Sequence, residues 1–306
     1  MHIAIVIVGF RNASDIQRCL TALGASTHTD FEVVICENGG RGAFDALVAA
    51  TPARLPGGQP VEVVLAPSNL GFAGGVNFGI GQCRDADAWW VLNPDTEPRP
   101  DALAAKVRRL SAGDCDAVGC ILVSPTGEIE AYGGLWRSLI ARTVALGTGR
   151  SADDRVDQRA IERNQNFLMG AAMLMGRRFV DTVGLMREDY FLYCEEAEWC
   201  LRGAAKGMRL GFAPEARIVH HRGTTTGAGE GIHQRPRMPI YLGERNRMLL
   251  TRDLFPTRLP VAAAAAAGQL FLRYAARGAW RQFGYGMSGL WAGLLNQRGA
   301  PEWITA

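Results

Sequence analysis

Short runs of apolar residues recur through the first third of the chain and alternate with amphipathic stretches. The apolar runs span residues 3–8, 31–36, 61–65 and 89–92. Their lengths are typical of buried strands. Segments with helical character lie between them at 15–23 and 41–50. This alternation predicts an α/β protein with a Rossmann-like, mostly parallel central sheet flanked by helices. Open sheets of this class bind ligands at the carboxyl ends of their strands.

The last fifty residues differ from the rest in charge. Residues 256–306 contain five Arg and one Glu, a charge of +4, whereas residues 1–255 contain 28 basic and 29 acidic side chains, a charge of −1. We therefore divide the chain into a domain at 1–255 and a helical C-terminal extension at 256–306. No basic stripe lies within the domain, so no nucleic-acid partner is expected.

The extension has the composition of an amphipathic helix. Its uncharged runs, 259–272 and 282–297, are shorter than the roughly 20 apolar residues that span a bilayer. It also contains Trp280, Trp291 and Trp303. This combination favours a helix that lies in a membrane interface. The alternative is a helix docked on the main domain, with Arg facing water and Trp in the core.

The remaining composition indicates a cytoplasmic protein. Apolar residues make up 48% of the chain, enough for a large core. The seven cysteines follow no C-x-x-C or C-x-x-C-H spacing, which disfavours zinc, redox and haem sites. The first apolar run has no positive leader and is too short for a signal peptide. We expect a cytoplasmic location, with attachment to the inner face of the plasma membrane if the extension binds lipid.

A glycine cluster follows the third apolar run, in S-N-L-G-F-A-G-G-V-N-F-G-I. A dinucleotide-binding fingerprint would follow the first strand, where the chain reads V-G-F-R-N with a single glycine, so an NAD site is disfavoured. We expect the glycines to let the backbone approach a ligand or a neighbouring helix closely. Asn69 and Asn77 offer amide groups there. A purely structural turn is the alternative.

Several polar motifs occur in a fixed order along residues 1–255. They are I-V-I-V-G-F-R-N, C-E-N-G-G, L-N-P-D-T, F-L-M-G-A-A-M-L-M-G-R-R, Y-F-L-Y-C-E-E-A-E-W-C-L-R, V-H-H-R-G and Y-L-G-E-R-N-R. In this order the chain resembles the inverting family 2 glycosyltransferases of the GT-A fold, in particular the rhamnosyltransferase-like bacterial branch. The resemblance implies a GT-A fold and the site roles given next.

The resemblance implies a divalent cation that neutralises the diphosphate of a nucleotide-sugar donor. The D-x-D-like motif of the family falls on Asn93-Pro94-Asp95, with Asp95 as the ligand of Mn²⁺ or Mg²⁺ and Asn93 a neutral stand-in near the ribose. Asp95-Thr96-Glu97 is a second register. A strand-end histidine is the other expected ligand, and its spacing favours His220 over His221. A proline-containing turn and a hydrogen-bonded histidine are the structural alternatives.

An acceptor hydroxyl must lose its proton as it attacks, so a carboxylate is expected as general base. The family position falls on Glu196, where aspartate is more usual. Glu195 is expected to orient the base or the acceptor, and Glu198 to pair with Arg202 one helical turn later. Alternatively, the glutamates only favour the start of a helix.

The resemblance also implies a set of donor contacts. Val8 and Phe10 are expected to pack against the nucleotide base of the donor, with Arg11 nearby. Glu37 is expected to accept a hydrogen bond from the nucleotide base or the ribose. Gly170 would form the floor under the sugar. Arg245 and Asn246 would approach the diphosphate, since arginine binds phosphate in a bidentate manner.

These features predict a metal-dependent inverting glycosyltransferase of cell-surface glycan synthesis. The donor is expected to be dTDP-rhamnose or a UDP-sugar, and the acceptor a hydroxyl of a saccharide or a lipid-linked molecule. One alternative is a catalytically silent glycan-binding or scaffolding domain, because Asn93 and Glu196 differ from the commoner residues. Another is a sugar-nucleotide pyrophosphorylase, although the basic glycine-rich loop it needs after the first strand is absent.

Overall fold

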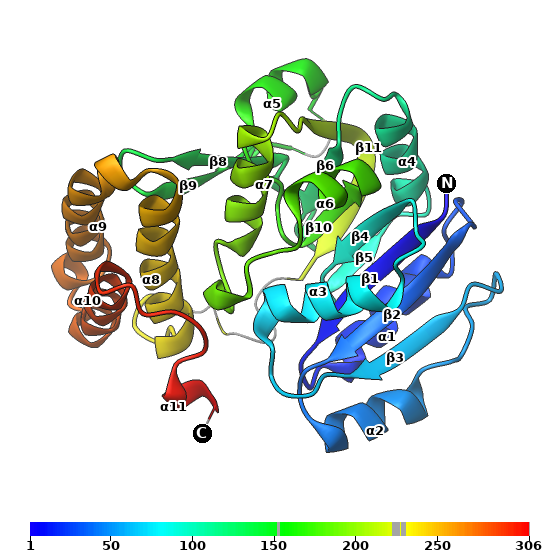
Figure 1. The fold of residues 1–306 in the computed structure, drawn as a ribbon, viewed down its shortest axis with the longest axis horizontal. Helices are drawn as coiled ribbons and strands as arrows, with labels where there is room; N and C mark the ends of the chain where they lie inside the picture. The colour runs from blue at the N-terminus through cyan, green and yellow to red at the C-terminus, as the bar shows by residue number, and fades with distance from the viewer. Residues whose placement is uncertain (152–153, 222–226, 228–230, 306) are drawn as a thin grey trace.

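One mixed sheet runs through the main body of the molecule and carries helices on both faces (Figure 1). The computed structural model describes residues 1–151, 154–221, 227 and 231–305. The strands are β1 Ile3–Gly9, β2 Phe31–Glu37, β3 Val61–Leu65, β4 Ala88–Leu92, β5 Thr96–Pro98, β6 Ala117–Val123, β7 Ile129–Ala131, β8 Gly133–Arg137, β9 Arg142–Leu146, β10 Ala172–Gly176 and β11 Leu210–His220. The α-helices are α1 Ala13–Leu23, α2 Arg41–Ala50, α3 Gly71–Gln82, α4 Ala102–Ser111, α5 Gln158–Asn164, α6 Arg177–Val183, α7 Glu195–Ala205, α8 Arg237–Leu254, α9 Leu259–Arg273, α10 Trp280–Leu294 and α11 Glu302–Thr305.

The sheet combines parallel strands with one reversed strand near its centre. The order is β3-β2-β1-β4-β10-β6-β11-β5, with β7 beside β6, while β8 and β9 form a separate hairpin. β10 is antiparallel to both β4 and β6, and β5 is antiparallel to β11. The four predicted strands appear as β1 to β4, and the two predicted helices as α1 and α2, within two residues at each end. The predicted α/β architecture is confirmed.

The central strands β1 and β4 are apolar on both faces because both faces are covered. In β1, Ile3, Ile5 and Ile7 pack with α1 and α4 on one side, while Ala4 and Val6 pack with α3 and α6 on the other. All seven cysteines are buried as free thiols. Burial raises the pKa of the Cys19 thiol to about 12.

The glycine cluster forms a helix that lies directly on the sheet. It makes up most of α3, and a Cβ added at Gly79 would stand 2.5 Å from Cγ1 of Val6. At Gly75 the corresponding distance to Cγ1 of Val8 is 2.6 Å. The close approach that we expected therefore occurs, at Gly75 and Gly79 to strand β1 and at Gly71 to the backbone of Phe191.

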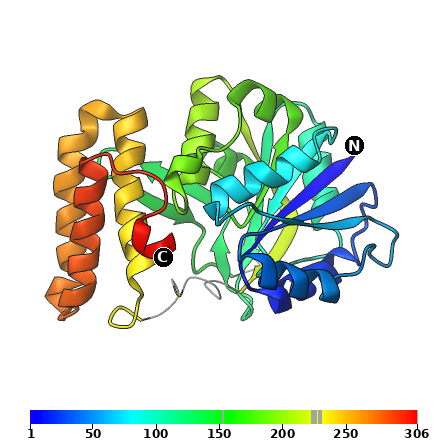
Figure 2. The ribbon, with the colours of Figure 1, turned by 60° about the horizontal axis from the view of Figure 1, so that its bottom comes forward.

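The C-terminal extension forms helices α9, α10 and α11, and α9 and α10 stand beside α8 at one end of the molecule (Figure 2). α10 presses closely on α8, because a Cβ at Gly289 would lie 2.3 Å from the carbonyl oxygen of Tyr241. Trp280 and Trp291 are each 62% exposed. The extension thus docks on helix α8 of the main domain, as the alternative expects, but Trp280 and Trp291 do not lie in a core. Within the described residues, none of the helices is long and apolar enough to cross a bilayer.

The contact between α3 and β1 predicts opposite effects of alanine at two glycines of one helix. Gly79→Ala should lower the free energy of unfolding by about 1–3 kcal/mol, since the added methyl overpacks Val6. Gly81 has open space around its Cα, so Gly81→Ala should be neutral or stabilise by up to about 1 kcal/mol. Urea unfolding of both variants measures the difference. Equal stabilities would contradict the packing described here.

Candidate active site

The two predicted metal ligands meet where β5 pairs with β11. The antiparallel register sets Thr96 opposite His220. The backbone N–H of His221 donates to the carbonyl oxygen of Asp95 over 2.9 Å. As a result, Nε2 of His220 lies 3.5 Å from Oδ1 of Asp95. The structure thus brings together two side chains that are distant in the sequence.

A second carboxylate orients His220. Nδ1 of His220 lies 2.9 Å from Oε2 of Glu130, which comes from β7. In the neutral ring, Nδ1 donates to this carboxylate and the lone pair of Nε2 faces Asp95, an arrangement common around metal-binding histidines, whereas in the protonated ring an N–H faces Asp95 instead. Burial lowers the pKa of His220, but Asp95 and Glu130 outweigh it and raise the pKa to about 9. Sequence reasoning missed Glu130, because a lone acidic residue in a short strand gives no signal.

The neighbouring histidine makes a different pair. Nε2 of His221 lies 2.7 Å from Oε1 of Glu97. Glu97, the second acidic residue of the Asp95-Thr96-Glu97 register, therefore contacts His221, the histidine that the spacing disfavours. The side chain of Glu97 is also 40% exposed, against 10% for Asp95. These contacts favour Asp95 and His220 as the inner pair.

Asp95 and His220 could hold a divalent cation only together with ligands from outside the protein. Oδ1 of Asp95 is buried and faces Nε2 of His220 at 3.5 Å without a hydrogen bond of good geometry, so a cation could be held between the two atoms. Among the described residues, no cluster of three or more His, Cys, Asp or Glu side chains is arranged to hold a metal. Asp95 and His220 would supply two ligands, and the donor diphosphate and water the rest, as is usual for Mg²⁺ and Mn²⁺.

Two adjacent glutamates begin helix α7. Glu195 is 2% exposed, and its Oε2 has no hydrogen-bond partner, while Glu196 is half-buried. Burial, followed by the charge of Glu196, raises the pKa of Glu195 to about 8. Burial also raises the pKa of Glu196. The two carboxylates therefore titrate as one interacting pair, and burial disfavours the charged form of each.

Glu196 stands above the ends of the central strands. A Cβ at Gly170 would lie 3.6 Å from Cγ of Glu196. The next residue, Ala171, accepts a hydrogen bond of 2.9 Å from the N–H of Asn93, where the turn carrying Asp95 begins. Gly170, Asn93 and Glu196 thus lie along one end of β4 and β10.

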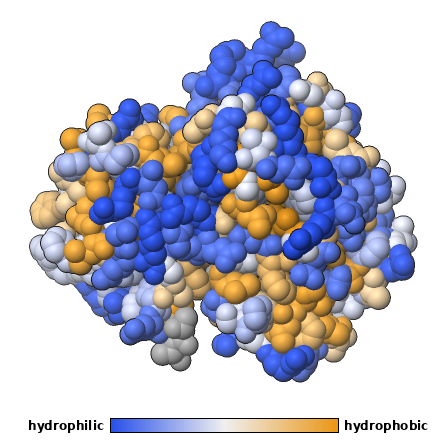
Figure 3. Space-filling model, in the orientation of Figure 1, coloured by the Kyte–Doolittle hydropathy of each residue, from blue (hydrophilic) through white to orange (hydrophobic). Residues whose placement is uncertain are grey.

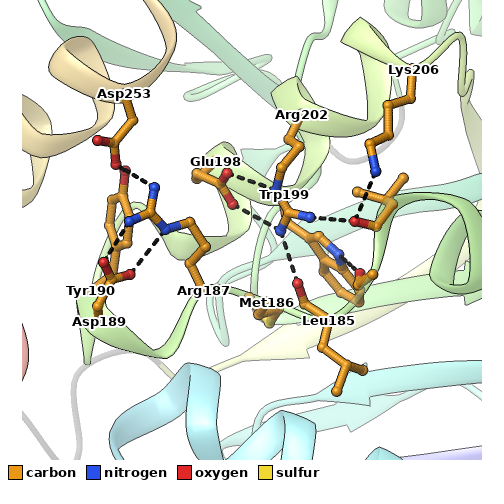
Figure 4. Close-up of polar contacts among 12 residues, drawn as sticks. Leu185, Met186, Arg187, Asp189, Tyr190, Glu198, Trp199, Arg202, Lys206 and Asp253 are labelled. Carbon is orange, nitrogen blue, oxygen red and sulfur yellow. Dashed lines mark hydrogen bonds and ion pairs between the residues drawn. The ribbon is translucent and has the colours of Figure 1, made fainter.

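The third glutamate of α7 has a structural role, as expected. Oε1 of Glu198 accepts a hydrogen bond of 2.8 Å from Nε of Arg202 (Figure 4). Arg202 also donates to the carbonyl oxygen of Leu185. The predicted pair one helical turn apart is confirmed.

A cavity of about 520 Å³ opens beside the ends of β1 and β2. Arg11 and Glu37 line it, together with the start of α2. Oε1 of Glu37 accepts hydrogen bonds from the backbone N–H groups of Arg11 and Gly39. The structure therefore places these two predicted base-binding residues at a cavity, and Glu37 also shapes its wall.

The other residues predicted to bind the donor contact groups of the protein itself. Val8 packs against α3, and the guanidinium of Arg11 lies 5.3 Å from the ring centre of Phe10. Oδ1 of Asn69 accepts from the N–H of Gly71. The amide of Asn77 is buried and bonds to Glu188 and to the backbone of Met186. The geometry assigns Asn77 to the packing of α3 in place of the expected donor contact.

Arg245 is also placed differently from the expectation. It is 1% exposed, and its guanidinium donates to Asn246, to the carbonyl oxygen of Gly299 and to that of Tyr190. Asn246 is fully buried beside it. The side chains of Arg245 and Asn246 both bond to backbone groups of the segment 190–193, which precedes α7. In this arrangement they do not face a diphosphate.

A carboxylate, an imidazole and a second carboxylate, from Asp95, His220 and Glu196, thus lie at neighbouring strand ends of an α/β sheet, where such folds bind ligands. Comparison with known proteins assigns the class of protein. Residues 4–184 match the family model described as glycosyl transferase family 2, and the chain belongs to this family. The protein is a glycosyltransferase. This assignment sets aside the pyrophosphorylase and the silent binding domain.

Individual relatives are more distant. The chain is 25% identical over 250 residues to the N-acetylglucosaminyl-diphospho-decaprenol L-rhamnosyltransferase of Mycobacterium tuberculosis, covering 75% of this chain and 79% of that one. The mannosyltransferase PcManGT of Pyrobaculum calidifontis, solved with GDP-Man and Mn²⁺, has a TM-score of 0.59 at 14% identity over 97% of this chain and 88% of that one. GalNAc-T7, solved with UDP, GalNAc and Mn²⁺, has a TM-score of 0.64 at 14% identity, and the match covers 82% of this chain and about half, 48%, of that one.

The buried glutamate predicts that stability falls as pH rises. The pKa of Glu195 is about 8 in the folded protein and 4.5 when unperturbed, so the folded state binds more protons between these values. The free energy of unfolding should therefore decrease from about pH 4.5 to about 8 by up to about 1.4 kcal/mol per pH unit. Glu195→Gln should flatten this slope, measured by urea unfolding at several pH values. Glu62→Gln, at an exposed position, is the control, and an unchanged slope in Glu195→Gln would refute the assignment.

Proposed function

We propose that this glycosyltransferase is metal-dependent and inverting, with Asp95 and His220 as cation ligands and Glu196 as general base. The observation that carries the proposal is the 3.5 Å approach of His220 to Asp95, in the turn that begins at Asn93 beside the strand ends over which Glu196 stands. A cation at this pair would neutralise the negative charge that develops on the departing nucleoside diphosphate. The proposal explains why a buried carboxylate oxygen of Asp95 faces His220 without a hydrogen bond of good geometry.

The chemistry follows a direct displacement. The acceptor oxygen forms a bond to the anomeric carbon from one face, while the bond from that carbon to the diphosphate breaks on the other, so the configuration inverts. The acceptor proton passes to the carboxylate of Glu196. Burial raises the pKa of Glu195 to about 8, so a second charge beside Glu196 is disfavoured at neutral pH. Arg11 and Glu37 border the cavity that would receive the nucleotide base.

We infer a deoxysugar donor such as dTDP-rhamnose, with a UDP-sugar as the other candidate. The support is the similarity to the mycobacterial L-rhamnosyltransferase, whose name describes a lipid-diphosphate acceptor. The acceptor here would be a hydroxyl of a saccharide or a lipid-linked molecule in cell-surface glycan synthesis.

Replacement of Glu196 should leave nucleotide binding intact and slow sugar transfer. Glu196→Gln should bind UDP or dTDP as tightly as the wild type, with the same gain on adding Mn²⁺, while turnover falls by about 10². Calorimetry with each nucleotide, with and without Mn²⁺, measures the first effect, and transfer assays across nucleotide sugars the second.

Glu62→Gln, the same change at an exposed position of β3, is the matched control. It should retain most of the turnover. If no nucleotide binds more tightly with metal, the metal-dependent mechanism is rejected. If Glu196→Gln keeps its turnover, the base lies elsewhere.

We further propose that the C-terminal helices rest on a membrane surface. The exposed positions of α9 before its last residue are all uncharged: Pro260, Val261, Ala264, Gly268, Phe271 and Leu272. Figure 3 shows apolar residues at this end of the molecule. At the turn between α9 and α10, the rings of Phe271 and Trp280 both contact Phe283 edge-on. Such aromatic groups favour the lipid interface.

The charges around this aromatic cluster fit an anionic surface. Exposed Arg258 precedes α9, and Arg273, Arg277 and Arg281 surround the turn. No acidic residue lies between positions 256 and 301. Apolar insertion flanked by cations is the pattern of interfacial helices on anionic lipids.

Removal of the exposed aromatic groups should release the protein from lipid. The double variant Phe271→Ser with Trp280→Ser should reduce co-sedimentation with anionic vesicles by about tenfold or more, since each buried aromatic side chain contributes about 1.5–3 kcal/mol. Val48→Ser, at an exposed apolar position on α2, is the control and should bind like the wild type. Equal partitioning of all three proteins, or none by the wild type, would reject membrane attachment.

A further inference from the structure

The turn that presents the two glutamates is strained. Phe191, Tyr193 and Cys194 have φ angles of 67°, 76° and 70°, in the left-handed region that residues with a side chain seldom occupy. Residues 191–194, here named the catalytic turn, lead directly into Glu195 and Glu196 at the start of α7. Strained conformations persist only when surrounding contacts determine them. The contacts around the turn therefore set the position of the base.

Helix α8 holds the turn through buried donors. Nδ2 of Asn246 lies within 2.9 Å of the carbonyl oxygens of Tyr190, Leu192 and Tyr193. Nη2 of Arg245 also donates to the carbonyl oxygen of Tyr190 over 2.9 Å. The remaining carbonyl oxygen, that of Phe191, accepts from the N–H of Phe72 at the start of α3. Every carbonyl group from 190 to 193 is therefore fixed by another element.

Residues near the C-terminus add further contacts to the segment before the catalytic turn. After α10, the N–H of Gly299 donates to the carbonyl oxygen of Asp189 over 2.7 Å, and its own carbonyl oxygen accepts from Nη1 of Arg245 over 2.6 Å. The guanidinium of Arg298 bonds to Asp189 over 2.9 Å and to Asp253 over 2.6 Å. Residues 298–299 thus connect the segment before the catalytic turn to α8.

Asp253 is the common partner in this network. Besides Arg298 it accepts hydrogen bonds from Nη1 of Arg187 over 2.7 Å and from the hydroxyl of Tyr190 over 2.9 Å. Figure 4 shows Arg187 reaching both Asp189 and Asp253 next to the ring of Tyr190. Two cations and two carboxylates, each partly buried, support one another and define one arrangement of the segment.

We propose that Arg298 and Gly299 form a C-terminal latch, a positioning element that fixes the catalytic turn and thereby the distance from Glu196 to the acceptor hydroxyl. This inference rests on the proposed role of Glu196 as base. The latch contacts neither Asp95 nor His220, which are held by β5 and β11. Loosening it should therefore affect the chemical step and spare the binding of donor and metal.

The test is Arg298→Ala in the full chain. We expect kcat to fall about tenfold or more, since displacements near 1 Å can cost up to about 10² in rate. KM for the nucleotide sugar and the Mn²⁺-dependent affinity for its nucleotide should stay within about twofold. Arg298→Lys keeps the positive charge but lacks the planar guanidinium that bonds Asp189 and Asp253 together, so it should recover part of the loss. Arg159→Ala, at an exposed position on α5, is the matched control and should behave as the wild type.

A second variant tests whether the residues act together. Asp253→Asn should also lower kcat, and the double variant with Arg298→Ala should lose less than the product of the two effects, because both belong to one network. Unchanged kcat in Arg298→Ala overturns the latch, as does an equal loss of nucleotide affinity, which would indicate general unfolding. If Arg298→Ala does not fold, the same criteria apply to Arg298→Lys and Asp253→Asn. Absence of transfer by the wild type would instead reject the proposed function itself.

Discussion

The antiparallel pairing of β5 with β11 is the constraint on which the site depends. β5 has only three residues and follows the turn that carries Asp95, so the position of this carboxylate is fixed once the ladder forms. Bringing two side chains together across so long a stretch of chain costs conformational entropy that one ion pair cannot repay. The ladder and the buried sheet behind it supply that free energy. A slip of one residue would exchange His220 and His221 between the two faces.

The two glutamates of α7 show how one helix start assigns different tasks to identical side chains. Both gain from the positive end of the helix dipole. Glu195 points into the protein, where desolvation opposes its ionisation, while Glu196 keeps partial access to water. Burial opposes a charge on either carboxylate, and Glu196 is the one that water can still reach. The same reasoning explains why Glu198, fully buried, needs Arg202 beside it.

Local patterns predicted the parallel half of the fold because its strands are short apolar runs and the helices between them are amphipathic. The resemblance to a family pointed to Asp95, His220 and Glu196 as site residues, and the structure brings Asp95 and His220 together. The sequence did not indicate that the glycines after β3 form a helix, because that depends on the space left above Val6 and Val8. Long-range partners were missed for a related reason. Glu130, Asp253 and Arg298 acquire their roles only through register and helix packing, and Arg245 follows the family motif but is turned toward the protein interior.

The bonds from Arg298 and Gly299 to the segment before α7 have a consequence for biosynthesis. Ribosomes release a chain from its N-terminus onward, so the sheet that holds Asp95 and His220 can assemble while the last helices are still being made. The frame around the catalytic turn closes only when residues 298 and 299 emerge. On this view the proposed cation ligands of a nascent chain come together before the turn that leads to Glu196 is fixed in place.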